Sequence, residues 1–130
     1  MVELQKLVRN EVMTERVEIY VPSTRNDTET LTGRCYFVTL TDQEHEEETL
    51  KTTGLFTSLF GGATYGPVFG AWLMQSGEIV REKIHIVYSF CTTHALKKHF
   101  KRVISEAERI KAALKQDAVT VVVNRQAILV

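Results

Sequence analysis

Proline, cysteine and long apolar runs are all scarce in this chain of 130 residues. Its two prolines argue against long disordered linkers, so we expect one domain that spans residues 1–130. Cys35 and Cys91 are widely separated and form no CxxC pair, which favours the reduced thiols of a cytoplasmic protein over a disulfide framework. No apolar run approaches the roughly 20 residues of a membrane span, and the amino-terminal segment lacks the apolar core of a secretion signal. We therefore expect a cytoplasmic protein without a membrane partner.

An excess of charge of either sign is also absent. Sixteen lysines and arginines balance sixteen aspartates and glutamates, so the formal net charge is zero. Nucleic-acid binding normally needs a surplus of cations on one face, which makes nucleic acid an unfavourable partner. Copies of a neutral chain repel one another little. The balance therefore favours self-association, and we expect a homo-oligomer.

Motifs for metal, phosphate or nucleophilic chemistry are missing as well. The glycines spell neither GxxxxGK[ST] nor GxGxxG, the two common phosphate-binding patterns. The histidines have no HxxxH spacing and predict no metal site: His45, His85, His94 and His99. We predict no cofactor and no metal. The absence of a catalytic motif favours a binding protein over an enzyme.

Two short segments near the amino terminus have contrasting patterns. Residues 16–21, RVEIYV, place valine and isoleucine on one face and Glu18 and Tyr20 on the other, which is the period of a half-buried strand. Residues 23–33 are dense in turn formers and predict a loop. Residues 35–40, CYFVTL, predict an extra strand that forms a hairpin with the first.

Two amphipathic segments predict helices. The first follows Thr41, which forms a capping-box pattern with Glu44, and it ends at Gly61, because glycine adopts the left-handed C-cap conformation without strain. The second begins at Thr92 or Thr93. It carries one apolar stripe at helical spacing, made by Leu96, Phe100, Val103, Ala107, Ile110 and Leu114.

The remaining segments predict strands. Residues 64–74 contain glycines and a proline, which favours an irregular or edge strand. After a turn at 75–78, residues 79–90 alternate, and we expect the larger side chains to face the helices: Ile84, Ile86, Tyr88 and Phe90. The opposite face would then carry His85, Val87 and Ser89. Residues 118–123 are β-branched, and residues 127–130 predict one more strand.

The order strand, helix, strand, strand, helix, strand predicts an α+β fold of the ferredoxin-like βαββαβ type. Right-handed crossovers place both helices on one face of an antiparallel sheet whose first and third strands are central. The other face is then uncovered. In so small a domain, an uncovered sheet face is normally an oligomer interface or one wall of a ligand cavity.

The expected open face brings three chemically active side chains together. His85 would lie near Glu18 and Tyr20, because the first and third strands are neighbours in this topology. A histidine beside a carboxylate is a workable acid/base pair near neutral pH. The alternative is that these residues line an oligomer interface that includes Val87 and satisfy one another there.

The start of the second helix concentrates hydroxyls and cations. Thr93, Lys97 and Lys98 lie on its first turns, an arrangement typical of an anion or nucleotide site. The alternative explanation is electrostatic. We expect both helices to start at the same end of the sheet, where the acidic start of the first helix, at residues 42–48, would offset these cations.

Four short segments of the chain carry a recognisable pattern: FGGAT at 60–64, GAW at 70–72 and GEIVREK at 77–83, preceded by VEIYVPS at 17–23. With these segments the chain resembles a family of small uncharacterised bacterial proteins with a ferredoxin-like fold. The resemblance implies the fold and no known activity. Tyr65 and Trp72 belong to this stretch, where we expect contacts with a ligand or partner.

The leading interpretation is a homo-oligomeric module that binds a small ligand, such as an anion, or a protein partner. Its expected contact residues are Tyr65, Trp72, His85, Thr93, Lys97 and Lys98. One alternative is a cofactorless isomerase or oxygenase of the dimeric α+β barrel kind, in which His85 is the acid/base and Tyr20 and Glu18 orient it. A second alternative is an anion or nucleotide binder at the start of the second helix.

Overall fold

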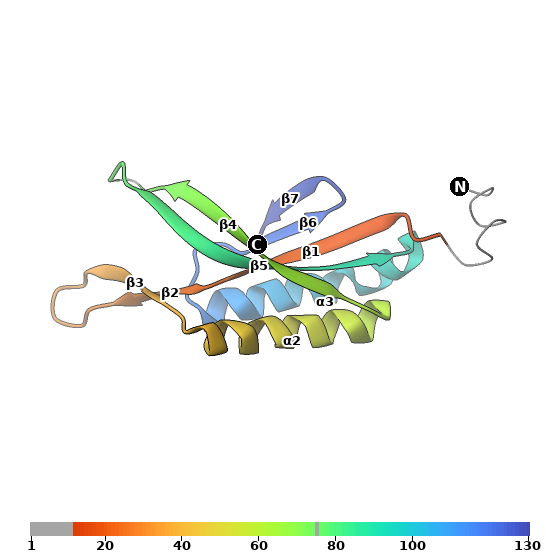
Figure 1. Cartoon of the computed structure of the whole chain (residues 1–130), viewed down its shortest axis with the longest axis horizontal. Coiled ribbons are helices and arrows are strands. Elements are labelled where there is room, and N and C mark those ends of the chain that lie inside the picture. Colours follow the sequence, from red (N-terminus) through yellow and green to blue (C-terminus); the bar gives the residue numbers. More distant parts are fainter. Residues whose placement is uncertain (1–11, 75) are drawn as a thin grey trace.

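The computed structural model describes residues 12–74 and 76–130. The amino-terminal segment, where we expect no secretion signal, and Gln75 of the predicted turn lie outside the described residues. Helices α2 (Asp42–Phe60) and α3 (Thr93–Ala113) both lie on one side of a five-stranded sheet (Figure 1). The predicted ferredoxin-like α+β fold is therefore confirmed. Neither of these helices combines the length and the low polarity that a membrane crossing requires.

The main sheet is antiparallel throughout, with the strand order β4-β5-β1-β6-β7. Its members are β1 (Glu15–Pro22), β4 (Thr64–Leu73), β5 (Ile79–Cys91), β6 (Thr120–Val123) and β7 (Gln126–Leu129). As predicted, the first and third strands of the βαββαβ unit, β1 and β5, are central, and the glycine-rich β4 lies at an edge. The predicted strand near the carboxyl end is β7, which extends the opposite edge through a tight turn where Asn124 has a φ of 59°.

A separate hairpin of β2 (Thr24–Thr28) and β3 (Cys35–Thr39) projects beyond the sheet between β1 and α2 (Figure 1). The strand predicted at 35–40 is confirmed, but its predicted pairing with the first strand is wrong, and the predicted loop at 23–33 contains β2. Both errors have one cause. The sequence TRNDT has no apolar alternation that would predict a strand. β2 is held instead by backbone hydrogen bonds to β3, which leave no pattern in the side chains.

The helix ends follow the predicted capping chemistry. The Thr41 hydroxyl accepts from the Glu44 amide at 3.1 Å, and the Glu44 carboxylate accepts from the Thr41 amide at 2.9 Å. Thr92 caps α3 by accepting from the Ala95 amide at 3.1 Å. Gly61 ends α2 with a φ of 87°, a left-handed conformation that costs other residues about 1 kcal/mol or more.

The two helices run antiparallel and start at opposite ends of the sheet (Figure 1). Arg109, near the end of α3, contacts Glu48, near the start of α2, at 3.1 Å. Phe60 at the end of α2 packs against His99 near the start of α3, with ring centroids 5.9 Å apart. The predicted charge compensation between the two helix starts is therefore wrong. Because β1 and β5 run in opposite directions, the segments that follow them begin at opposite ends of the sheet.

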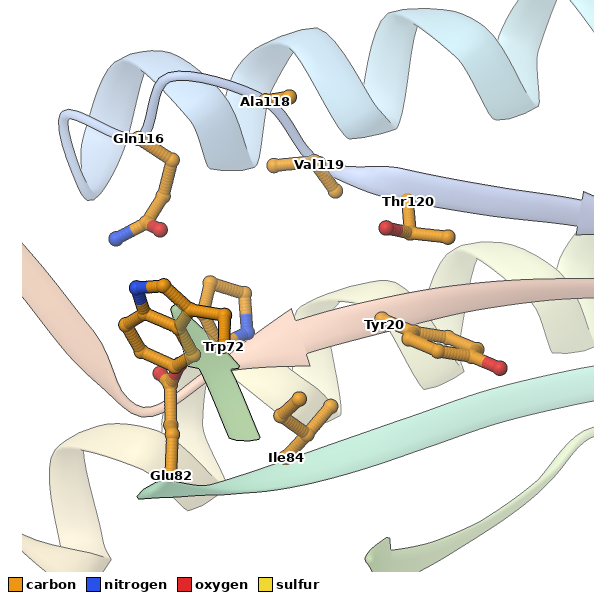
Figure 2. A pocket seen from close by; sticks show the side chains of 9 residues that line it. Tyr20, Trp72, Glu82, Ile84, Gln116, Ala118, Val119 and Thr120 are labelled. Carbon is orange, nitrogen blue, oxygen red and sulfur yellow. The ribbon is translucent and has the colours of Figure 1, made fainter. Parts of the chain in front are cut away.

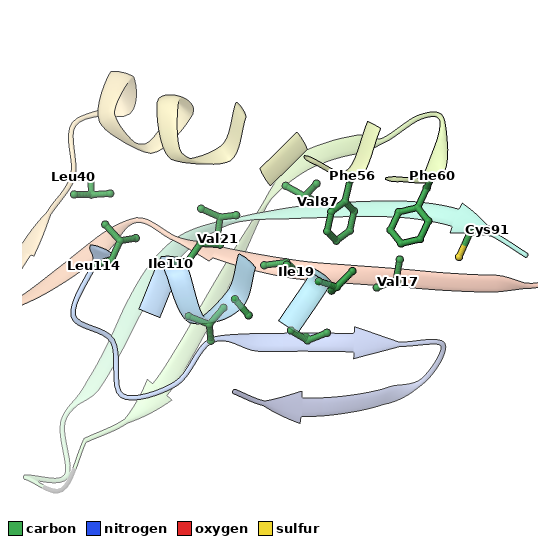
Figure 3. Close-up of a cluster of buried hydrophobic side chains, with 14 residues drawn as sticks. Val17, Ile19, Val21, Leu40, Phe56, Phe60, Val87, Cys91, Ile110 and Leu114 are labelled. Carbon is green, nitrogen blue, oxygen red and sulfur yellow. The ribbon is translucent and has the colours of Figure 1, made fainter. Parts of the chain in front are cut away.

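The core lies between the sheet and the two helices (Figure 3). Val17, Ile19 and Val21 of β1 are fully buried and lie at its centre. The stripe on α3 contributes as predicted, with Val103, Ala107, Ile110 and Leu114 buried. The core is thus built from the alternation of β1 and the helical period of α3.

The register between β1 and β5 decides which side chains of β5 enter that core. Ile19 pairs with Val87, and Val21 pairs with His85; residues paired in this way point to the same face. Val87 is accordingly 0% exposed and His85 6%. The alternate set points away from the helices: Ile84, Ile86, Tyr88 and Phe90. The predicted faces of this strand are therefore wrong, because both of its alternating sets contain residues that can be buried, and only the partner strand decides between them.

Candidate functional site

The sheet face opposite the helices carries a large apolar surface. Both helices pack on the other face, and no further described element lies over this one (Figure 1). Phe90 is 51% exposed and Trp72 40%. The half-buried members of the same face are Tyr20, Ile84, Ile86, Tyr88 and Val122. Apolar side chains exposed together on one sheet face are a candidate interaction site.

At one end of this open face, Arg16 lies across two aromatic rings. Its guanidinium carbon is 3.8 Å from the centroid of Tyr88 and 5.5 Å from that of Phe90. Its Nη2 also donates to Glu18 Oε1 at 2.8 Å. The ring faces attract the cation, and the carboxylate balances its charge. This end of the face is consequently aromatic and close to neutral.

At the other end of the open face is a cleft of about 300 Å³ (Figure 2). Its walls come from β1, β4, β5 and the segment between α3 and β6, and its main side chains are Tyr20, Pro22, Trp72, Glu82, Ile84 and Gln116. Gly70 helps to shape it. A Cβ at Gly70 would lie 3.1 Å from Ile84 Cδ1, so the glycine leaves room for the Ile84 side chain.

Glu82 is the buried acid of this cleft, with 8% of its surface exposed. Its Oε1 accepts hydrogen bonds from the Ser23 amide at 2.7 Å and the Thr24 hydroxyl at 2.9 Å. Its Oε2 accepts no hydrogen bond from the described residues. Because every fully buried side-chain oxygen or nitrogen in the described chain has a partner, Oε2 must reach solvent. Figure 2 shows the carboxylate beside the Trp72 ring.

Gln116 supplies a second oriented acceptor. Its Nε2 donates to the Thr24 carbonyl at 2.7 Å, which sets the direction of the amide. The amide oxygen, Oε1, accepts no hydrogen bond from the described residues, and the side chain points toward Trp72 (Figure 2). Glu82 and Gln116 thus each contribute one oxygen acceptor to the cleft. Hydrogen bonds to Ser23 and Thr24 orient both side chains.

On the helix side of the sheet, His85 stacks on His45. Their ring centroids are 3.8 Å apart at an angle of 12°. The Thr49 hydroxyl donates to the His45 carbonyl at 2.8 Å, so it accepts from His85 Nδ1, also at 2.8 Å. His45 Nε2 donates to the Val21 carbonyl at 2.9 Å. Neutral His85 therefore carries its proton on Nδ1, and burial, together with the nearby His45, lowers its pKa.

Tyr65 also lies on this side of the sheet. Its ring centroid is 5.7 Å from that of His85, and its hydroxyl donates to the Glu46 carboxylate. This hydrogen bond raises the pKa of Tyr65. Tyr65 and His85 are the predicted ligand residues that the structure brings together, whereas Trp72 lies on the opposite face of the sheet.

The predicted convergence of His85 with Glu18 and Tyr20 is wrong. Glu18 pairs with Tyr88 and Tyr20 with Ile86, so both side chains lie on the open face while His85 lies in the core. Glu18 is bound instead by Arg16. The sheet itself separates His85 from the other two members of the predicted acid/base group.

The start of α3 contains a carboxylate from the chain itself. The Thr93 hydroxyl donates to Glu15 Oε1 at 2.9 Å, and Asn124 Nδ2 donates to Glu15 Oε2 at 2.6 Å. The hydrogen bonds from Asn124 and Thr93 lower the pKa of Glu15. Lys97 and Lys98 are exposed on the following turn, at the opposite end of α3 from Gln116. The predicted ligand residues are thus spread over three places in the fold.

Sequence reasoning missed Glu82, Gln116, His45 and Thr49. A signal existed for the helix residues, because His45, Thr49, Thr52 and Phe56 recur at helical spacing and all four are buried. Glu82 could have been placed with Ile84 by strand alternation once the face was known. Gln116 follows the end of α3, where no period applies.

No family model and no curated protein matches this chain. Among solved structures, it is similar to a phage SAM lyase in complex with S-methyl-5'-thioadenosine, at 16% identity and a TM-score of 0.55, over 88% of this chain and 83% of that one. CutA from Synechococcus elongatus aligns at 12% identity and a TM-score of 0.48, over 91% and 81% of the two chains. The likeness to the lyase is one of fold alone. The resemblance to a family of small bacterial proteins is accordingly confirmed only as a small α+β fold of the ferredoxin-like kind.

Proposed function

We propose that this chain is a homo-oligomeric binding module that self-associates through its open sheet face and holds a small ligand in the cleft at Trp72. One observation carries the proposal: the central strand β5 turns its large apolar side chains outward. These are Ile84, Ile86, Tyr88 and Phe90, whereas the core takes His85, Val87 and Ser89. Exposing these larger apolar side chains to water is unfavourable. A second protein surface that covered this face would therefore stabilise the molecule.

A second copy of the chain is the occupant that the charges and dimensions favour. Arg16 and Glu18 balance each other on the face, and the whole chain has no net charge, so two such faces do not repel. Five strands that lie about 4.8 Å apart and average about eight residues in length present a face of roughly 600 Å². Stable interfaces bury about 800 Å² of accessible surface per partner, a comparable size. Two sheets stacked face to face are also a common packing mode.

The other two interpretations have less support. An enzyme in which His85, Glu18 and Tyr20 act together would need them on one side of the sheet. An anion site at the start of α3 would have to displace Glu15, which already accepts from Thr93. The open face remains the surface with an unexplained excess of apolar side chains.

The experiment is light scattering on the purified protein at micromolar concentration. We expect an oligomer for the wild type and a monomer for Ile86→Lys, because an ammonium at the centre of the apolar face would be buried without a partner. Val87, which we expected at the interface, is unsuitable, since it is 0% exposed in the core and a charge there would unfold the monomer.

The matched control is Leu50→Lys. Leu50 is 50% exposed on α2, on the other side of the molecule, so this change adds the same charge without touching the open face. The Leu50→Lys variant should form an oligomer of the same mass as the wild type. A monomeric wild type, or an Ile86→Lys variant that is folded and still oligomeric, contradicts self-association through this face.

A further inference from the structure

The Trp72 cleft adjoins a second cavity of about 280 Å³, because Trp72, Gln116 and Ala118 line both. The second cavity adds Phe37, Met74 and Asp117. The combined lining of the two cavities has two carboxylates, on Glu82 and Asp117, and no lysine or arginine among the described residues. The two adjoining cavities therefore carry a negative charge that none of their described lining side chains offsets.

Three cations line cavities that adjoin these two. Lys115 Nζ lies 3.5 Å from Asp27 Oδ1, and Lys83 Nζ lies 3.8 Å from Asp42 Oδ1. Arg81 alternates with Glu82 along β5 and so points to the opposite face of the sheet from Trp72. A ligand with a negative charge, such as a phosphate, would meet Glu82 and Asp117 without a compensating side chain.

The hydrogen-bonding groups of the cleft also favour a positively charged ligand. Glu82 is more than nine-tenths buried, and its Oε1 accepts hydrogen bonds from Ser23 and Thr24. Its Oε2 has no partner among the described residues, and the carboxylate lies beside the Trp72 ring (Figure 2). Gln116 Oε1 is a second acceptor there. A carboxylate oxygen held in so little water is stabilised by a ligand that donates a hydrogen bond, most strongly by a charged donor.

The apolar walls define the shape of the ligand. Trp72 from β4 and Tyr20 from β1 both border the cleft, with Ile84 beside them (Figure 2). Indole and phenol faces bind flat groups by stacking and attract cations through their π electrons. A small planar cation would use the carboxylate and the rings at once.

We infer that the Trp72 cleft binds a planar organic cation with N–H donors, with its charge on Glu82 and its flat body against Trp72. This inference deepens the proposed function and rests on its ligand cleft, not on the oligomer interface. Amidinium and protonated aromatic amine groups are the chemical class that meets these requirements.

The test uses three flat probes of nearly equal size and different charge: benzamidinium, benzamide and benzoate. Trp72 is the only tryptophan of the chain, so its fluorescence reports on the cleft directly. We expect saturable binding of benzamidinium with a Kd about tenfold or more below that of benzamide, the value of one charge-assisted hydrogen bond, and no binding of benzoate. Equal or tighter binding of benzamide or benzoate overturns the inference.

Glu82→Gln keeps the shape of the side chain and the acceptor for the Ser23 amide but removes the charge. It should weaken benzamidinium binding about tenfold and leave benzamide binding unchanged. The control is Glu108→Gln, at an exposed position of α3, which should change neither. Unchanged benzamidinium affinity in folded Glu82→Gln overturns the inference; if that variant does not fold, the three probes on the wild type decide.

The two proposals fail in different ways. If none of the three probes alters Trp72 fluorescence, the ligand cleft and the cation inference both fall, while light scattering still decides self-association. If a neutral or anionic probe binds best, the cleft stands as a ligand site and only its charge preference is wrong.

Discussion

At the scale of single residues, the buried polar groups of this fold are held in defined hydrogen-bonded states. His45, Thr49 and His85 form a connected set that ends on the backbone carbonyls of β1 and α2. None of their polar atoms is buried without a partner. These residues are therefore part of the core of the monomer. A proton added to His85 places a positive charge inside that core.

The lowered pKa of His85 predicts acid sensitivity. Its ordinary pKa is 6.5. Burial, His45 and Lys83 oppose its protonation in the folded protein, more than Glu46 and Asp42 favour it. Below that value the unfolded chain binds a proton that the folded chain resists, so this contribution to stability is complete above about pH 6.5 and is lost as the pH falls. The urea midpoint should drop between about pH 7.5 and 5.5.

The residue responsible can be identified by substitution. His85→Gln keeps a side chain that can bond to Thr49 but cannot titrate, so its urea midpoint should change less with pH than that of the wild type. His94→Gln, at an exposed position at the start of α3, should retain the wild-type dependence. An unchanged pH profile in His85→Gln would remove His85 as the cause.

At the scale of elements, the two helices are joined by a charged network. Arg109 Nε donates to Glu106 Oε1 at 2.7 Å and its Nη2 to Oε2 at 3.0 Å, while the Thr52 hydroxyl donates to the same Oε2 at 2.7 Å. Arg109 Nη1 reaches Glu48 at 3.1 Å. Glu106 first, and then Glu48, raise the pKa of Arg109 above its usual range. This network locks the end of α3 to the start of α2.

Removing the cation should destabilise the helix pair. We expect Arg109→Met to lower the free energy of unfolding by about 1 to 3 kcal/mol, because Glu106 is 7% exposed and would remain buried without its cation. This expected loss is smaller than that for a fully buried ion pair, because the Arg109 side chain is 36% exposed and solvent screens its charge. Urea denaturation measures the difference.

Lys51→Met serves as the control for this change. Lys51 pairs with Glu48 at 3.1 Å but is 60% exposed, so losing it should cost less than about 1 kcal/mol. Equal losses in the two variants would show that Arg109 contributes no more than a surface ion pair.

Elements differ in how well the sequence predicts them. The capping box at Thr41 and the C-cap at Gly61 are local, because each depends on residues within one turn of the chain. The stripe of α3 is equally local. The strand β2 is not, since its partner β3 provides the hydrogen bonds that define it. Local chemistry therefore predicted both helices and missed that strand.

At the scale of the whole molecule, the fold has one covered and one open sheet face (Figure 1). The open face divides into an aromatic, nearly neutral end at Arg16 and a cleft with a carboxylate at Glu82. Self-association and the ligand cleft are therefore both proposed for the open face, and a second copy that covered this face would border the cleft.

Association through this face predicts that stability depends on concentration. The Tm of the wild type should rise over about a hundredfold increase in protein concentration, because mass action favours a folded oligomer over unfolded chains. The Tm of Ile86→Lys should stay constant over the same range. Differential scanning fluorimetry measures both, and a wild-type Tm that does not move with concentration contradicts the proposal.

The sequence by itself determined the helices, their caps and the βαββαβ order, because these follow from spacings of a few residues along one segment. Only the tertiary structure decided which face of β5 is buried, since its pairing with β1 places Val87 opposite Ile19. The same long-range pairing assembles the cleft. It brings Trp72, Glu82 and Gln116 together from three separate segments. No local sequence pattern in any of these segments predicts that the three residues line one cleft.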